Sequence, residues 1–383
     1  MSQEPASQKA IALHYERAQS MCRHAALSLG DIQHLSQKFW NFHFDLIAAR
    51  DMTAFIIATI HVNLCIGTLS PFIRDRPDLA DLLEKLLNFD LCGQFMLTEV
   101  GHGLDARRPG DQGDAASRWL LRPPHPQRRS GKGDASDYSL LWNAKSRNRV
   151  CSPDGTLSLS IMGVSAIKVG THIAGTYSQR RTITAPDGHT CLPIMSFSTQ
   201  QRPIIEGWVQ GLVSELLGGK YSLPAPRDPT AVLARREQRM MEAAMSKLKD
   251  IGGYGGHRGQ AFNQHILPCC RPIAEAIGHR MAYEAATELG ACPKVLRLYE
   301  HMCVGTDFRQ FSCDGHTLQA FEDAAVEAYD DVFADMLQSL QNSEADAYTT
   351  APIMSNKSWA VFVDKMQAFK GPSGHARGAQ PKL

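Results

Sequence analysis

The stretch QFMLTEVGHGLDAR at residues 94–107 is the most informative part of this sequence. An apolar run ends at Thr98, and two glycines, Gly101 and Gly103, follow with one residue between them. Because glycine has no Cβ, backbone N–H groups at such a turn can come close to a ring edge or a phosphate. A plain strand and turn with a glycine bend is the alternative, and local physical chemistry alone favours it.

The residues before this stretch, from about 8 to 97, follow a helical pattern. Residues 35–50 place apolar side chains among polar ones, and residues 52–69 are almost wholly apolar, which is typical of a buried helix. After the start signal Pro77, a short amphipathic helix is expected over 78–87. Since no run reaches about 18 consecutive apolar residues, we expect no membrane-spanning helix.

The residues after the stretch change character. Segment 107–149 holds ten basic residues and four aspartates, and it includes Pro123-Pro124-His125-Pro126. Few apolar residues repeat with any period, so the segment is expected to be irregular. Its charge would attract a phosphorylated ligand or nucleic acid, but a solvated loop is the preferred interpretation. Its composition is also compatible with intron sequence or a frameshift in the gene model, which sequencing the transcript across codons 107–154 would decide.

Helical periodicity returns in the second half of the chain, and a tight turn is expected at 185–188. The predicted helices cover 156–177, 204–217, 231–249, 272–289 and 318–340. The fold class is therefore mainly α, with the few strands confined to about 94–150. The expected organisation is a helical N-terminal domain at 8–93, a reduced β-region at 94–154, a helical C-terminal domain at 155–345 and a tail at 346–383.

Composition narrows the class of protein. The 383 residues include 40 Lys and Arg against 39 Asp and Glu, which argues against a nucleic-acid binder. The ten cysteines form no CxxC pair, so we expect free thiols and no metal site. The N-terminus lacks a signal-peptide pattern. The C-terminal Pro381-Lys382-Leu383 partly matches a peroxisomal address, so the expected location is peroxisomal or cytoplasmic.

Residues 98–103 resemble the signature of the acyl-CoA oxidase/acyl-CoA dehydrogenase family, in which an apolar strand runs into T-E-x-G-H-G. The resemblance implies that Thr98 hydrogen-bonds a flavin ring and that Gly101 and Gly103 form the turn beside flavin and acyl-CoA. His102 points to the oxidase branch. Leu104 stands where the dehydrogenase branch has serine, so that ligand contact is not expected here.

A second pair of segments resembles the same family. IAGTYSQRR at 173–181 and PIMSFSTQQ at 193–201 are similar to its helix-turn-helix with a distal glutamine. The resemblance implies that Arg181 and Gln200 contact the flavin diphosphate, often that of the neighbouring subunit, and arginine suits bidentate phosphate binding. A surface arginine pair beside a capped helix is the alternative.

The chain departs from the family in two places. Only 46 residues separate Arg107 from Asp154, where the family has a full β-domain. The carboxylate that should take the substrate's α-proton in a dry site is also missing from its usual sequence context. Glu275 is the candidate stand-in. Its helix also carries His279, Glu284 and Glu288, so a solvated face is the alternative.

The resemblance implies a flavin-dependent oxidoreductase that desaturates an acyl thioester at Cα–Cβ, with FAD as hydride acceptor and O2 as terminal oxidant. Acyl-CoA or a related thioester would be the substrate, in β-oxidation or in acyl or polyketide tailoring, and the protein would be a homodimer. The competing hypothesis is a catalytically degenerate family member that acts as a structural or interaction protein. The absence of a β-domain favours this second hypothesis.

Overall fold

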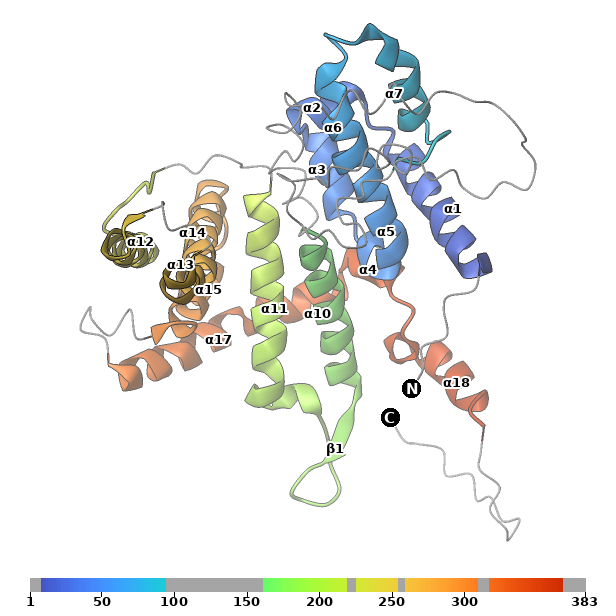
Figure 1. The fold of residues 1–383 in the computed structure, drawn as a ribbon. Coiled ribbons are helices and arrows are strands. Elements are labelled where there is room, and N and C mark those ends of the chain that lie inside the picture. The colour runs from blue at the N-terminus through green and yellow to red at the C-terminus, as the bar shows by residue number, and fades with distance from the viewer. Residues whose placement is uncertain (1–7, 94–160, 219–224, 254–258, 309–316, 368–383) are drawn as a thin grey trace. The chain divides into compact units, whose positions relative to one another are not determined.

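A computed structural model describes residues 8–93, 161–218, 225–253, 259–308 and 317–367 (Figure 1). The chain forms two compact units, Met1–Ala166 and Ile167–Leu383. The described residues are mainly helical, and their strands form one two-stranded sheet. The expected mainly α fold class is confirmed at this level. The motif at 98–103 and the segment 107–149 lie outside the described residues.

Unit 1 is built from short helices around one apolar core. Its elements are α1 Gln8–Ala25, α2 Leu29–His34, α3 Gln37–Phe44, α4 Ile47–Arg50, α5 Met52–Thr59, the π-helix η1 Ile60–Ile66, α6 Gly67–Leu69, the 3-10 helices η2 Ser70–Phe72 and η3 Pro77–Leu79, and α7 Ala80–Leu87. The core includes Phe39, Phe55, Leu83 and Leu86, each at most 1% exposed. The amphipathic helix predicted over 78–87 is therefore present as η3 and α7.

Capping side chains set the breaks between the first helices. Ser28 and Asp31 form a capping box at the start of α2, and Leu35 in the left-handed region ends that helix. The helix predicted over 35–50 is divided into α3 and α4, because the backbone at Asp45 is extended. The Asp51 carboxylate then accepts from the Ala54 N–H at 3.1 Å, capping α5.

The helical run Met52–Phe72 has a mean hydropathy of 1.7 in its most apolar window, so its length and composition would allow it to cross a membrane. Of that window, 44% is buried within the protein, and the core helix of a soluble protein has the same composition. The run also carries buried His61 and Asn63, whose side chains have internal partners. The buried helix predicted at 52–69 is confirmed, and the absence of a membrane span stays a prediction.

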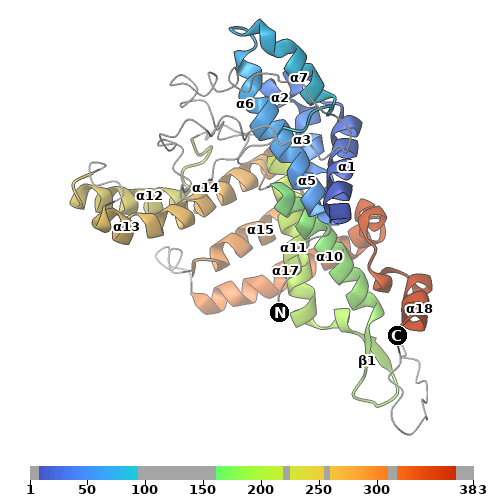
Figure 2. The ribbon, with the colours of Figure 1, turned by 45° about the vertical axis from the view of Figure 1, so that its right-hand side comes forward.

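Unit 2 is a helical bundle with one hairpin. Its elements are α10 Met162–Arg180, which begins in unit 1, β1 Thr182–Thr184, β2 Cys191–Pro193, η7 Ile194–Ser196, α11 Ser198–Leu217, α12 Val232–Asp250, α13 Gln260–His265, α14 Leu267–Glu288, α15 Pro293–Gly305, α17 Leu318–Gln341, η9 Glu344–Tyr348, η10 Pro352–Met354 and α18 Asn356–Asp364. Helices α10 and α11 run side by side and are joined by the hairpin (Figure 1, Figure 2).

The core of unit 2 surrounds α11. Helices α14, α15 and α17 all pack on α11. Val209 of α11, Leu298 of α15 and Val332 of α17 have no exposed surface. This arrangement joins helices that are far apart in the sequence, and the cavity described below lies among α11, α15 and α17.

Three features of unit 2 differ from the sequence predictions. The hairpin pairs Thr182 with Pro193 and Thr184 with Cys191, so the described strands lie outside 94–150. The turn predicted at 185–188, in contrast, is present and closes this hairpin, with the Gly188 N–H donating to the Ala185 carbonyl at 2.9 Å. Helix α15 was not predicted, although Pro293 supplies a start signal. The segment from 346, expected as a tail, contains helix α18.

Candidate functional sites

The flavin-contacting residues expected from the sequence, Thr98, Gly101 and Gly103, lie outside the described residues. The structure does describe Gly93, which directly precedes their stretch. The Gly93 N–H donates to His61 Nδ1 at 2.9 Å. His61 Nε2 lies 2.8 Å from the Leu86 carbonyl, so this nitrogen carries the proton. Burial lowers the pKa of His61 and keeps the ring neutral, as an acceptor at Nδ1 must be.

Close packing also fixes the backbone at Gly93. A Cβ at this position would overlap the Cys65 side chain, whose own Cβ would be 2.7 Å away. His61 and Cys65 both belong to the π-helix η1, and π-helical turns are frequent at functional sites. The π-helix therefore fixes the backbone at Gly93, the last described residue before the motif.

A second buried histidine lies in the same unit. His43 Nδ1 donates to the Phe39 carbonyl at 2.8 Å, and Asn63 Nδ2 donates to His43 Nε2 at 2.9 Å. Burial lowers the pKa of His43 to about 4. Asn63, together with Phe39 and Arg74, lines a cavity of about 460 Å³. The cavity has the size of a small-molecule site, but Asn63 is engaged with His43, and Gln33 donates to the Ser70 carbonyl at 2.9 Å.

The structure brings Arg181 and Gln200 to the same end of the α10–α11 pair. Gln200 Nε2 donates to Ser178 Oγ at 2.8 Å, and Ser178 lies one turn before Arg181. The Arg181 carbonyl accepts from the Ile194 N–H at 2.8 Å, so its backbone is held in the hairpin. Its side chain is exposed. The neighbouring Arg180, in contrast, is hydrogen-bonded to Asn356.

Glu275 lies on an exposed face of α14. Its carboxylate accepts from Arg271 Nε at 2.7 Å and the side chain is 44% exposed. This hydrogen bond holds the pKa of Glu275 below its ordinary value, and the charge on Arg236 adds to the effect. A base that takes a proton from carbon needs the opposite shift. The observed geometry matches the solvated-face alternative. The role of Glu275 as a base stays a prediction.

Helices α12 and α14 share a buried polar cluster that was not predicted from the sequence. Arg236 is 2% exposed and donates to His279 Nδ1 at 3.0 Å. Arg280, also 2% exposed, is paired with Glu237 at 2.5 Å and with Glu284 at 2.7 Å. These partners offset the cost of burying the Arg280 charge. The sequence signal was the placement of Arg236 three residues after the buried Leu233, on the apolar face of α12.

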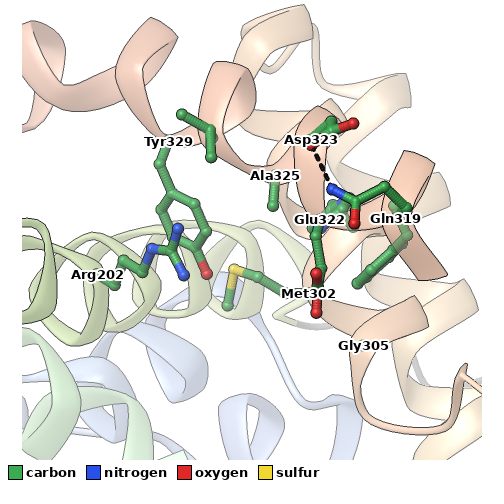
Figure 3. A pocket seen from close by; sticks show the side chains of 11 residues that line it. Arg202, Met302, Gly305, Gln319, Glu322, Asp323, Ala325 and Tyr329 are labelled. Carbon is green, nitrogen blue, oxygen red and sulfur yellow. Dashed lines mark hydrogen bonds between the residues drawn. The ribbon is translucent and has the colours of Figure 1, made fainter.

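A cavity of about 480 Å³ lies among α11, α15 and α17 (Figure 3). Arg202 of α11 contributes its guanidinium, which lies 5.2 Å from the centre of the Tyr329 ring. The Tyr329 hydroxyl donates to the Glu206 carboxylate. Burial raises the pKa of Tyr329, and the Glu206 hydrogen bond raises it further. Tyr329 is therefore a neutral, fixed ring on which the cation rests.

Two further aromatic rings line the cavity. His301 and Phe321 stack with ring centres 3.8 Å apart and an angle of 11° between the planes. Burial lowers the pKa of His301, and the charges of Arg202 and Arg297 lower it further, so the imidazole is neutral near pH 7. Gln319 Nε2 donates to the Asp323 carboxylate at 2.9 Å at the rim.

The cysteines and possible metal ligands of the described ranges are scattered. The eight described cysteines are free, and burial raises the pKa of Cys65 and of Cys303 to about 12. These two thiols are therefore not nucleophiles at neutral pH. Within the described ranges, no three His, Cys, Asp or Glu side chains gather as metal ligands.

Comparison of the chain with protein-family models, with curated proteins and with solved structures gave no match. The family resemblance therefore rests on the motifs at 98–103, 173–181 and 193–201 alone.

Proposed function

We propose that this protein is a flavin-dependent oxidoreductase of the acyl-CoA oxidase type, which desaturates an acyl thioester at Cα–Cβ. The resemblance of residues 98–103 to the family signature supports the assignment. The structural observation that carries it is the common position of Arg181 and Gln200 at one end of the α10–α11 pair. The two segments that resemble the family's diphosphate-binding segments, 173–181 and 193–201, thus lie next to each other in the fold.

The side chains at this end of the pair fit a diphosphate. Arg181 is exposed, and no described carboxylate lies within 4.0 Å of its guanidinium, so its donors are available to phosphate oxygens. Gln200 gives one amide hydrogen to Ser178 and keeps a second one. Thr98, Gly101 and Gly103 would hold the ring edge. Bound FAD supplies the hydride acceptor in this chemistry, with O2 as the terminal oxidant.

Proton removal from the substrate needs a carboxylate at the thioester α-carbon. Glu275 stays the proposed base, and its ion pair with Arg271 would have to open before it could act. The expected partners are an acyl-CoA or related thioester and a second copy of the chain. The expected location stays peroxisomal or cytoplasmic.

A flavin titration of the purified full chain tests this proposal. We expect saturable FAD binding with a shifted flavin absorption band, and anaerobic bleaching of that band on addition of an acyl-CoA. Arg181→Gln should weaken FAD binding by roughly tenfold, because it removes a charge-assisted contact to phosphate. Arg180→Gln is the matched control, since the Arg180 guanidinium is committed to Asn356, and it should leave FAD affinity within about twofold.

No FAD binding at saturating concentrations would refute the proposal. The geometry of Glu275 favours one alternative, a catalytically degenerate member of the family with a structural or interaction role. Each described carboxyl group whose pKa departs clearly from its ordinary value has a lowered pKa, including Glu275. FAD binding without bleaching by any acyl-CoA would support this alternative.

A further inference from the structure

The cavity of unit 2 contains a cation that is oriented but not neutralised. The Arg202 guanidinium lies over the Tyr329 ring, and no described carboxylate lies within 4.0 Å of it. Glu206, one turn along α11, is engaged by the Tyr329 hydroxyl instead. Because a cation–π contact uses none of the guanidinium N–H donors, those of Arg202 suit a planar acceptor with two oxygens.

The remainder of the cavity suits an uncharged body. The stacked rings of His301 and Phe321 provide a flat wall, and Met302 and Val326 provide apolar surface. The volume of about 480 Å³ is in the range of small-molecule sites. The cavity thus combines one cation with aromatic and apolar side chains from three helices, and Glu322 and Asp323 lie on the side away from Arg202 (Figure 3).

Two acidic side chains limit the charge that a ligand can carry. Glu322 and Asp323 of α17 also line the cavity. They would repel a ligand that carries several negative charges. A ligand with a single carboxylate can place that group on Arg202 and present only its uncharged body to Glu322 and Asp323. The same repulsion disfavours polyphosphates such as nucleotides and coenzyme A.

We propose that the cavity among α11, α15 and α17 binds a small amphipathic monocarboxylate, with its carboxylate on Arg202 and its apolar body on the His301–Phe321 stack. The site is separate from the hairpin end of α10 and α11, where Arg181 and Gln200 lie. It goes beyond the proposed flavin function and does not depend on it.

Calorimetric titration of the full chain with 4-phenylbutyrate tests the site. We expect saturable one-to-one binding with a dissociation constant below about 1 mM. The neutral isostere 4-phenylbutyramide should bind at least tenfold more weakly, because it cannot form the charge-assisted pair. Inorganic pyrophosphate should bind more weakly than 4-phenylbutyrate, because of Glu322 and Asp323.

Two variants, together with one control variant, test whether the ligand binds in this cavity. Arg202→Gln should weaken 4-phenylbutyrate binding at least tenfold. Arg297→Gln is the matched control, because Arg297 also lies near His301 but is paired with Asp331 at 2.7 Å and does not line the cavity. It should change the affinity by less than about twofold. Val326→Trp keeps the charge and fills the space, so it should abolish binding even if Arg202→Gln fails to fold.

Three outcomes would contradict the proposed binding site. Equal affinity for the acid and the amide would remove the role of Arg202, and tighter binding of pyrophosphate would show a polyanion site instead. Undiminished binding by Val326→Trp would place the ligand elsewhere.

Discussion

At the scale of single residues, His43 and His61 are buried in unit 1 as neutral rings. Each ring nitrogen has a partner, so neither imidazole leaves a polar atom unsatisfied. His61 positions Gly93, and His43 positions Asn63. Both histidines are structural in their neutral form. A proton added to His43 Nε2 or His61 Nδ1 would turn a hydrogen-bond acceptor into a donor and break the observed hydrogen bond.

The depressed pKa of His43 predicts acid sensitivity. Its pKa is about 4 in the folded protein and about 6.5 in the unfolded chain. Between these values the unfolded chain binds a proton that the folded protein does not, so stability is complete above pH 6.5 and falls as the pH drops toward 4. The loss from this residue amounts to roughly 3 kcal/mol.

Measuring the free energy of unfolding from pH 7.5 to 4 checks this prediction. His43→Gln lacks the titrating group and should show a flatter pH profile over that range, even if it is less stable at pH 7.5. His34→Gln, at an exposed histidine of the same unit, is the matched control for loss of an imidazole without loss of buried contacts. A slope in His43→Gln equal to that of the unmodified protein would contradict the assignment.

At the scale of elements, helix α10 shows how packing changes the role of one residue type. Gly175 faces Leu340 of α17, and a Cβ at this position would overlap the leucine side chain. Gly170, on the same helix, has no other atom within 4 Å of a built Cβ. One glycine is therefore required for a close approach between helices, and the other is only a weak helix former.

Paired substitutions test this difference. Gly170→Ala should stabilise unit 2 by about 1 kcal/mol through helix propensity. Gly175→Ala gains the same propensity but overpacks the buried Leu340, so it should be roughly 1–3 kcal/mol less stable than Gly170→Ala. Chemical denaturation of the two variants gives the comparison. Equal stabilities would mean that α17 shifts without cost.

At the scale of the whole molecule, the described residues contain two separate large cores. One is formed by the helices of unit 1 and includes Leu83 of α7, and the other surrounds α11 and includes Leu298 of α15. Both side chains are completely buried. Since each core belongs to one compact unit, the units are expected to unfold in separate cooperative transitions.

Scanning calorimetry of two cavity-forming variants checks this expectation. Leu83→Ala and Leu298→Ala should each cost about 2–5 kcal/mol. Each substitution should lower one of two thermal transitions and leave the other in place, so that each variant is the control for the other. A single transition lowered by both substitutions would show that the two cores unfold together.

Much of the helical framework can be predicted from the sequence. The apolar residues of 231–249 and 318–340 repeat with the helical period, and the structure has α12 and α17 there. The turn residues at 185–188 were recognised, but the strands on either side of it were not. Strands of three residues are too short to show an alternating pattern, and they depend on pairing with each other.

The candidate sites can likewise be divided into features that the sequence predicts and features that depend on tertiary packing. The sequence by itself determined which residues resemble a flavin-binding signature and which segments are apolar enough to be buried, because both properties are local. Only the tertiary structure decided that Arg236 is buried, that Glu275 is exposed, and that Arg202, His301 and Tyr329 share a cavity. These properties depend on which helices pack together, and packing joins side chains about 100 residues apart without leaving a pattern in the local sequence.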